Sequence, residues 1–334
     1  MELVIINNPA TIGWQANLLD LVLLVMFASA VVYAIAQWRR GVRAYVTLLV
    51  AAFFYGVVLE LGGMALLNMY VQGDFTVMLN FRALAPFQGT TAMPFYVLIF
   101  YPVFLFTGFK VVEAWGITRR WQAAVTGGLF MVAFDAPYII EGGLRHVVWW
   151  TWRSDFPMFQ YWLDWPLVDL CWQATWDAMF FYLMLWALPH IDPPGRRGWS
   201  TAKSLLVFAP LCALVTIAVG PLLIAPQTAV TFLGGRQWPV VLALILGYVV
   251  VAARALRTAH PARDRVEPVT GWIVGVYVAA MAAMVIANAV HEGALLSYIT
   301  VQAAGLLVIC GLTLFPWLAT RRRPVTIAAA DATS

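Results

Sequence analysis

Residues 14–66 read WQANLLDLVLLVMFASAVVYAIAQ-WRRGVR-AYVTLLVAAFFYGVVLELGGMAL. Two apolar runs, 14–37 and 44–66, are joined by a short connection that contains Arg39, Arg40 and Arg43. A helix needs about 20 apolar residues to cross the hydrocarbon core of a bilayer. The stretch therefore predicts two membrane-spanning helices joined by a basic loop.

The composition extends this prediction to the whole chain. Of 334 residues, 63% are hydrophobic and 11% are charged, whereas soluble proteins have about 45–50% apolar and about 25% charged residues. A water-soluble domain of this composition would lack the polar side chains to cover its surface. We expect an all-α fold, with a single transmembrane helical domain over residues 1–320 and a cytoplasmic tail over residues 321–334.

A scan for apolar runs long enough to cross a bilayer predicts nine spans. They are residues 14–37, 44–66, 93–114, 121–141, 167–188, 204–225, 238–256, 270–290 and 295–319.

The distribution of basic residues predicts the orientation of these spans, because Lys and Arg are disfavoured in short outer loops. With nine spans and an outer N-terminus, the outer side has only Arg82, Arg145, Arg153 and Arg236. The inner connections then contain the other sixteen of the twenty Lys and Arg residues: Arg39, Arg40, Arg43, Lys110, Arg119, Arg120, Arg196, Arg197, Lys203, Arg254, Arg257, Arg263, Arg265, Arg321, Arg322 and Arg323. We expect a multi-pass protein of a bacterial inner (cytoplasmic) membrane, with its N-terminus outside and its C-terminus in the cytoplasm.

Several function classes are disfavoured. The net charge of +4 is spread between the apolar segments and forms no basic patch, so we expect no nucleic-acid partner. Cys171, Cys212 and Cys310 each lie in an apolar stretch, which argues against disulfides and a metal cluster. The sequence has no phosphate-binding glycine motif, nucleophile elbow or metal-ligand spacing. We expect no metal and no cofactor, and nothing in the sequence indicates an oligomeric state.

Two predicted outer connections, 67–92 and 142–166, are long and rich in aromatic residues. One interpretation is a belt of Trp and Tyr at the membrane interface. The alternative is that both connections fold back over the helix bundle. We expect this arrangement because burial of Phe75, Trp149 and Trp162 would stabilise the folded protein.

Candidate site residues are acids inside the predicted spans, where an ionisable group is costly and usually functional. Glu60 lies near the outer end of the second span and Asp135 near that of the fourth, while Asp169 and Asp177 lie in the fifth. The four acids are expected in the outer half of the bundle. Glu141, six residues after Asp135, is expected at the interface.

Aromatic residues accompany these acids. In the fifth span, Asp169, Trp172, Trp176 and Asp177 have offsets of 0, 3, 7 and 8, which predicts one helical face. Tyr138 follows Asp135 by three residues. Seven of the sixteen tryptophans fall between residues 149 and 176. The pattern predicts a pocket walled by indole rings, suited to a flat apolar ligand or to a carbocation held by cation–π attraction.

Residues 55–180 resemble the integral-membrane carotenoid hydratases of the bacterioruberin type. The similarity consists of an acid late in one helix followed by a tyrosine, here Glu60 and Tyr70, and then an Asp before a Trp-rich stretch. The second motif corresponds here to Asp135, Trp149, Trp150, Trp152, Pro157 and Trp162. The chain departs from the family at residues 155–158, where a more regular Gly/Val-Pro-Leu-x-Asn-Phe run is expected.

The resemblance implies acid-initiated hydration or cyclisation of an isoprenoid or carotenoid-like lipid. A carboxylic acid, Asp135 or Asp177, would protonate an alkene, and Glu60 would act as base or position water. Trp150, Trp172 and Trp176 would stabilise the cation, with Tyr70, Tyr138 and Asp169 also contacting the substrate. An apolar environment suits this chemistry because it disfavours the ionised form of a carboxyl group.

Two other functions fit the same residues. In a membrane transporter or carrier, the acids would be proton or cation sites on an access path. In a scaffold protein, they would only form hydrogen bonds between helices. A structure that reveals whether Glu60, Asp135 and Asp177 line one cavity would discriminate among these functions.

Overall fold

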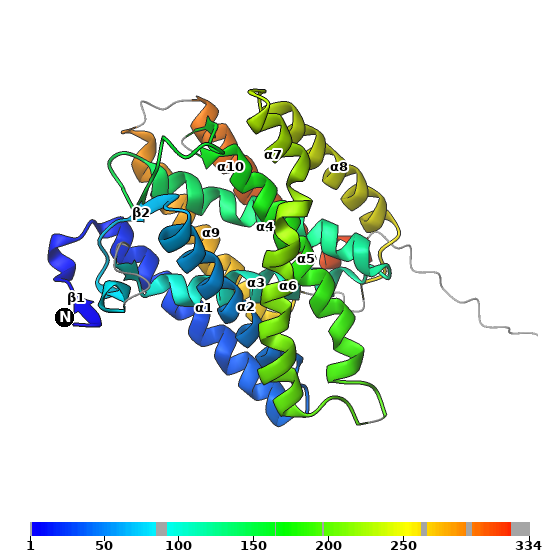
Figure 1. Ribbon diagram of the computed structural model, residues 1–334. Coiled ribbons are helices and arrows are strands. Elements are labelled where there is room, and N and C mark those ends of the chain that lie inside the picture. The colour runs from blue at the N-terminus through cyan, green and yellow to red at the C-terminus, as the bar shows by residue number, and fades with distance from the viewer. Residues whose placement is uncertain are drawn as a thin grey trace, which may run out of the picture.

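The computed structural model describes residues 2–84, 92–163, 165–195, 197–261, 266–291 and 296–321, and within these ranges the chain forms ten α-helices (Figure 1). They are α1 (Trp14–Arg39), α2 (Ala44–Leu61), α3 (Tyr96–Trp115), α4 (Arg120–Gly143), α5 (Leu167–Ile191), α6 (Ala209–Leu223), α7 (Ala225–Phe232), α8 (Trp238–Arg257), α9 (Pro268–Ala289) and α10 (Leu296–Arg321). Two π-helical segments extend the bundle, with η2 (Gly62–Leu66) continuing α2 and η5 (Lys203–Phe208) leading into α6.

Eight helical segments in the described part of the chain are long and apolar enough to cross a membrane. They coincide with eight of the nine predicted spans and define a multi-pass membrane protein. The remaining predicted span, 167–188, corresponds to α5, which is 25 residues long, but polar residues such as Asp169, Gln173 and Asp177 lower its hydropathy. The number of spans and their orientation stay predictions. The predicted tail lies outside the described residues except for Arg321.

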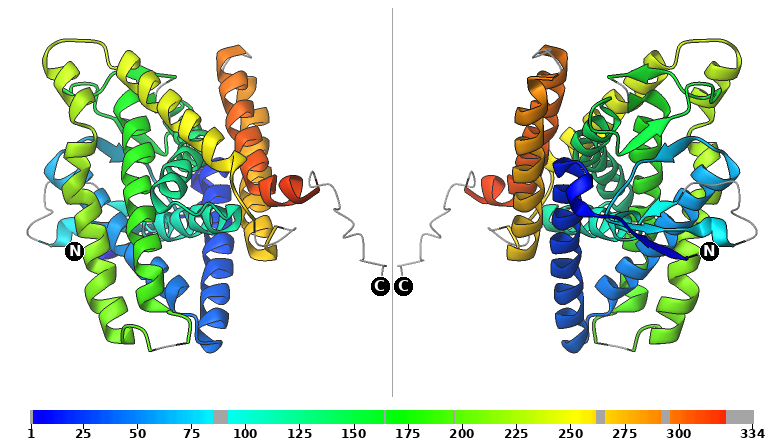
Figure 2. Two further views of the ribbon diagram at one scale, coloured as in Figure 1. Left: turned by 90° about the vertical axis from the view of Figure 1, so that its right-hand side faces the viewer. Right: turned by 90° about the vertical axis from the view of Figure 1, so that its left-hand side faces the viewer.

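The helices α3 and α4 form the centre of the bundle. In the most apolar 18-residue stretch of each helix, 83% of the residues of α3 and 89% of those of α4 are buried, against 17% for α8. Figure 2 shows α9 and α10 side by side at one edge of the molecule. The close approach of α4 to α5 depends on Gly128, since a Cβ there would lie 2.1 Å from the carbonyl oxygen of Ala174. Small residues at helix contacts are typical of membrane bundles.

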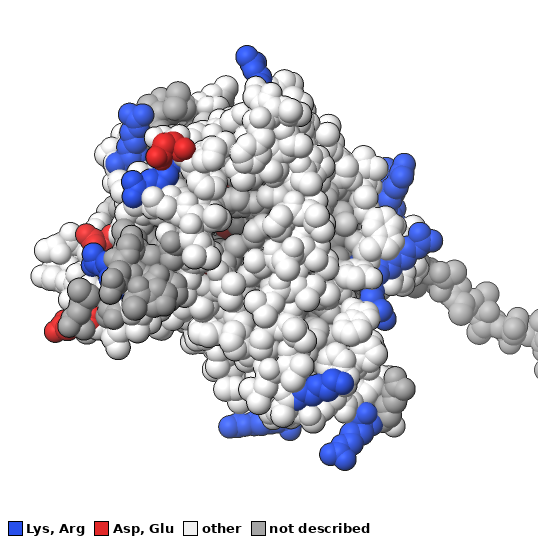
Figure 3. Space-filling model, in the orientation of Figure 1, with Lys and Arg blue, Asp and Glu red and all other residues white. Residues whose placement is uncertain are grey.

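Charged groups lie at the margins of the molecule. Figure 3 shows Lys, Arg, Asp and Glu mainly around the edges of a broad face that is otherwise uncharged. Large apolar side chains are exposed on the helices at the outside of the bundle, among them Leu211 and Leu214 on α6 and Leu242 and Leu246 on α8. Exposed apolar surface of this extent is expected where helices contact lipid.

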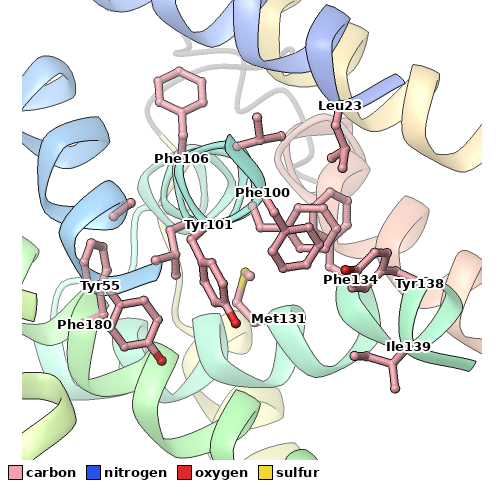
Figure 4. Close-up of a cluster of buried hydrophobic side chains, with 14 of the residues drawn as sticks. Leu23, Tyr55, Phe100, Tyr101, Phe106, Met131, Phe134, Tyr138, Ile139 and Phe180 are labelled. Carbon is pink, nitrogen blue, oxygen red and sulfur yellow. The ribbon is translucent and has the colours of Figure 1, made fainter. Parts of the chain in front are cut away.

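The core is rich in aromatic rings on both sides of α3. Figure 4 shows Tyr55 and Phe180 gathered near Tyr101, while Phe100, Phe134 and Tyr138 lie together on the other side of α3. The ring centroids of Phe100 and Tyr138 are 4.4 Å apart, and those of Tyr55 and Phe180 are 5.7 Å apart. This cluster fills the space between α2, α3, α4 and α5.

The long connections fold over the bundle through short antiparallel ribbons, which the all-α prediction did not include. The strands are β1 (Val4–Ile6), β2 (Tyr70–Gln72), β3 (Val77–Leu79), β4 (Met93–Pro94), β5 (Trp150–Trp152), β6 (Tyr161–Trp162) and β7 (Trp165–Pro166), and the pairs are β1–β3, β3–β4, β2–β5 and β6–β7. Phe75 and Trp149 are fully buried, which confirms that these aromatic residues cover the bundle. The prediction is wrong for Trp162, which is 46% exposed at the edge of a two-stranded ribbon. Residues 85–91 of the first connection lie outside the described residues.

Lys110, assigned from the sequence to an inner connection, is instead buried in α3. Its Nζ lies 2.5 Å from a carboxylate oxygen of Glu113 and 2.7 Å from one of Glu267. It also donates to the hydroxyls of Tyr33 and Tyr45, at 3.2 and 3.0 Å. The buried charge is therefore fully paired, and it ties α3 to α1, α2 and the start of α9.

Candidate functional site

A cavity of about 350 Å³ lies between α2, α3, α4, α5 and η2, with further lining residues from β2, β5 and α6. Its lining contains three acids and nine aromatic residues, and most of the remaining residues are aliphatic or glycine. Its acidic and aromatic lining residues are Glu60, Asp135, Asp169, Tyr55, Tyr70, Phe100, Tyr101, Tyr138, Trp150, Trp152, Trp172 and Trp176. A volume of this size is within the range of small-molecule sites.

Eight of the nine candidate site residues chosen from the sequence line this cavity: Glu60, Tyr70, Asp135, Tyr138, Trp150, Asp169, Trp172 and Trp176. Asp177 does not line it. Its carboxyl group is buried and is hydrogen-bonded to the hydroxyl of Tyr55. The preceding residue, Trp176, still lines the cavity, whereas the side chain of Asp177 is engaged by Tyr55 on α2.

Asp135 is the exceptional acid of the cavity. Its side chain is 1% exposed, and neither carboxyl oxygen has a hydrogen-bond partner among the described residues. Glu60, Asp169 and Asp177 are close enough to interact with it electrostatically. A carboxylate with no donor in an apolar enclosure carries a large desolvation cost, so this geometry favours the uncharged acid.

Glu60, in the last turn of α2, has the opposite surroundings. Its carboxylate accepts a hydrogen bond of 2.5 Å from the hydroxyl of Tyr101 and a second from the hydroxyl of Tyr70. Desolvation raises the pKa of the Tyr70 phenol well above its usual value, which keeps this hydroxyl protonated as a donor. Two donors stabilise a negative charge on Glu60.

Asp169 lies in the first turn of α5, where the partial positive charge of the helix N-terminus favours an acid. Its Oδ2 accepts a hydrogen bond of 2.6 Å from the indole N–H of Trp165. These contacts give Asp169 a local structural partner that Asp135 lacks.

Indole and phenol rings surround the acids. The ring centroids of Trp172 and Trp176 are 5.8 Å apart, and those of Tyr138 and Trp150 are 4.9 Å apart. The indole nitrogens of four cavity tryptophans have no hydrogen-bond partner in the described part of the chain, namely Trp150, Trp152, Trp172 and Trp176. Buried N–H groups are rarely left unpaired, so their concentration here is consistent with a site that receives an oxygen-bearing molecule.

Sequence reasoning missed Tyr55, Tyr101 and Gln72, and it named Trp152 only as part of the Trp-rich motif. Tyr101 follows Glu60 by 41 residues and comes from another helix, so no local spacing relates the two. Tyr55 lies five residues before Glu60 on the same predicted helix, an offset that does not place the two on one helical face, so helical spacing did not indicate it.

Glu141 was expected at the interface, and this prediction is wrong. Its side chain is fully buried between α4, α9 and α10. The carboxylate accepts hydrogen bonds from Asn288 at 2.5 Å, from Gln302 at 2.6 Å and from the hydroxyl of Tyr298. Three donors satisfy this acid, so it connects helices instead of lining the cavity.

Within the described ranges, no group of three or more His, Cys, Asp and Glu side chains is arranged to hold a metal ion. Comparison with protein-family models, with curated proteins and with solved structures finds no match to this chain. The fold and cavity define a multi-pass helical membrane protein with an acidic, aromatic-lined internal site.

Proposed function

We propose that the protein is an integral membrane enzyme that acts on an isoprenoid or carotenoid-like lipid by acid-initiated hydration or cyclisation. The observation that carries the proposal is the buried, unpartnered carboxyl group of Asp135 in a cavity walled by aromatic rings. The resemblance of residues 55–180 to the carotenoid hydratases supports the same chemistry.

Asp135 is the proton donor in this mechanism. Its O–H bond breaks as a C–H bond forms at one carbon of an alkene, which leaves a carboxylate on Asp135 and a carbocation at the neighbouring carbon. Faces of Trp150, Trp172 and Trp176 stabilise the cation, and each cation–π contact is worth about 2 kcal/mol when desolvated. Asp177 is less suitable as the acid because it lies outside the cavity lining and is bonded to Tyr55.

Glu60 completes the reaction as the base. In hydration, a water oxygen bonds to the cation and its surplus proton passes to Glu60, so that the product is an alcohol. In cyclisation, a second alkene of the same molecule bonds to the cation, and a carbon next to the new cation loses its proton to Glu60. Transfer of a proton back to Asp135 through water restores the enzyme in both cases. The two phenols on Glu60 fix its position for this step.

Isotope incorporation tests this function. Purified protein in lipid vesicles is incubated with an acyclic carotenoid such as lycopene in deuterated water, and the products are analysed by mass spectrometry. We expect carbon-bound deuterium in the product, and we expect its loss in Asp135→Asn, because an amide of similar volume cannot supply an acidic proton. Asp177→Asn is the matched control and should retain most of the activity. Full activity of Asp135→Asn would contradict the proposal.

A proton-coupled carrier is the second candidate, favoured by the electrostatic interaction of Asp135 with Glu60 and Asp169. Acidic residues that lie close together inside the membrane are typical of proton pathways. Proton flux across sealed vesicles that contain the protein, measured with a pH-sensitive dye and abolished in Asp135→Asn, would favour the carrier. Deuterated product without proton flux would favour the enzyme.

A further inference from the structure

Apolar residues of α2, η2 and α6, together with Leu67 just after η2, contribute part of the cavity lining. Val58, Leu66 and Leu67 contribute to its lining and are 37%, 84% and 55% exposed, and Gly62 and Ile217 complete this group. We call these five residues the portal. Figure 3 shows acidic surface recessed between uncharged atoms, in the region where Figure 1 places α2 and α6.

The surroundings of the portal are those of a lipid-facing surface. None of its five residues is charged or polar. Val58, Gly62 and Ile217 lie in segments that are apolar enough to span a membrane, Ala44–Met64 and Lys203–Leu223, and Leu66 and Leu67 follow just after the first of these segments. On the neighbouring surface of α6, Leu211 and Leu214 are half exposed. An opening with this rim communicates with hydrocarbon more readily than with water.

A different part of the cavity lining is covered by the ribbon of β2 and β5. Tyr70 and Gln72 on β2 pair with Trp152 and Trp150 on β5, and all four contribute to the lining. The ring of Tyr70 lies 5.4 Å from that of Trp152. Backbone pairing and ring packing therefore close the cavity on the side formed by the aromatic connections, which leaves the aliphatic side for entry.

The cavity volume limits how much of a ligand it can enclose. A protein cavity of about 150 Å³ holds one benzene molecule, so about 350 Å³ accommodates about a dozen carbon atoms. A longer chain cannot be enclosed completely and must extend through the opening.

We infer, on the basis of the proposed function, that the apolar end of a linear isoprenoid chain enters sideways from the bilayer through the portal, while the rest of the chain remains among the lipids. The reacting alkene is therefore one near the chain end, where the cavity brings it to Asp135. This selects long linear lipids by their terminal unit and tolerates differences at the other end.

Gly62 provides the means to close the portal. Its backbone is helical, with φ of −63°, so a side chain is tolerated there without strain. A Cβ at this position meets no described heavy atom within 4 Å. Gly62→Phe therefore adds a ring beside the cavity with little effect on packing. Gly247 on α8 has equally open surroundings among the described residues and lies outside the cavity lining, which makes Gly247→Phe the matched control.

The experiment uses a geranylgeraniol probe with a diazirine on its terminal isoprene unit, mixed into phosphatidylcholine vesicles that contain the full chain. After illumination, labelled peptides are identified by mass spectrometry. In the unmodified protein we expect label on the cavity segments of α4 and α5. Gly62→Phe should reduce this label by about tenfold, the loss expected when two or more methylene groups no longer enter an apolar site. Gly247→Phe should not change it.

Ile217→Trp, on the opposite side of the portal, provides a second closing variant if Gly62→Phe fails to fold. A probe with its diazirine at the hydroxyl end should label the region of Leu66 instead of the cavity. Unchanged cavity labelling in both closing variants would overturn the inference, as would cavity labelling by a charged, water-soluble diazirine that is insensitive to them. Cavity labelling without turnover of any isoprenoid would contradict the proposed function and leave the portal supported. Turnover that both closing variants leave unchanged would overturn the portal alone.

Discussion

Glu60 and Tyr101 are separated by 41 residues in the chain and joined by a hydrogen bond of 2.5 Å across the interface of α2 and α3. The same carboxylate accepts a hydrogen bond from Tyr70 on β2. One acid is thereby fixed by a membrane helix on one side and by the ribbon over the cavity on the other. Asp135 has no such partners in the described part of the chain, and this contrast is the basis for giving the two acids different roles in the proposed mechanism.

Removal of the hydroxyl at Tyr101 should weaken both the fold and the site. We expect Tyr101→Phe to lower the free energy of unfolding by about 1–3 kcal/mol, because the buried side of the Glu60 carboxylate loses a charged hydrogen bond. Thermal unfolding of the purified protein in detergent measures the change. Tyr182→Phe, at an exposed ring on α5, is the control and should be neutral. Equal stability of the two variants would contradict the assigned role of Tyr101.

The position of Tyr101 depends on Gly56. A Cβ at Gly56 would lie 2.5 Å from the ring of Tyr101, so Gly56→Ala should force the ring away and destabilise the protein by about 1–3 kcal/mol. Gly62→Ala, in the same segment but in open surroundings, should leave stability unchanged or slightly increased. Circular dichroism melting curves compare the two. If Gly56→Ala melts like Gly62→Ala, the close packing of α2 on α3 is not as described.

Glu141 should contribute to stability without acting in the cavity. In Glu141→Gln, an amide N–H₂ group faces the donors Asn288 and Gln302, so we expect a loss of about 1–3 kcal/mol in unfolding free energy. Below the melting temperature, labelling by the isoprenoid probe should be unchanged. Glu2→Gln, at an exposed residue, controls for the charge change. Loss of probe labelling in folded Glu141→Gln would show that this acid also acts on the cavity.

Orientation in the membrane follows from the unequal distribution of basic residues. A reporter fused after residue 330 should be active on the cytoplasmic side, because fifteen of the twenty Lys and Arg residues, with the buried Lys110 left out, fall on that side when nine spans alternate from an outer N-terminus. A fusion in the connection between α4 and α5 should report the outer side. An outer signal at residue 330 would exclude nine alternating spans with this orientation.

The helices could be predicted from the sequence because the hydropathy and length of each apolar run determine where a membrane helix forms. The predicted span 44–66 matches α2 and η2 together, Ala44–Leu66, to the residue. The sequence also indicated eight of the cavity residues. For four of them, Asp135, Tyr138, Trp172 and Trp176, the reason is that depth in the membrane and helical spacing place them close together.

Contacts between distant segments could not be predicted in this way. The pairing of Tyr70 with Trp152 and the bond from Tyr101 to Glu60 join parts of the chain that share no periodic pattern. Asp177 was misplaced because a shared helical stripe does not reveal that its carboxyl group bonds to Tyr55 on another helix. Glu141 was misplaced because its donors come from α9 and α10, far along the chain.

Trp176 provides the sharpest test of cation stabilisation. Its indole packs directly on α6, where a Cβ at Gly220 would lie 2.3 Å from the ring, and it lines the cavity together with Asp135. We expect Trp176→Leu to reduce turnover by about thirtyfold at most, since a desolvated cation–π contact is worth about 2 kcal/mol. Gly220→Ala should also reduce turnover, because the displaced indole no longer faces the developing charge in its original position.

The comparison of Trp176→Phe with Trp176→Leu separates electrostatics from packing. Phenylalanine retains an aromatic face and should restore part of the lost rate, whereas leucine fills space without a negative ring face. Rate constants for the committed step are measured in single-turnover experiments in vesicles, with Asp135→Asn as the inactive reference. Equal rates for the phenylalanine and leucine variants would leave Trp176 a packing residue and remove cation stabilisation by this indole from the mechanism.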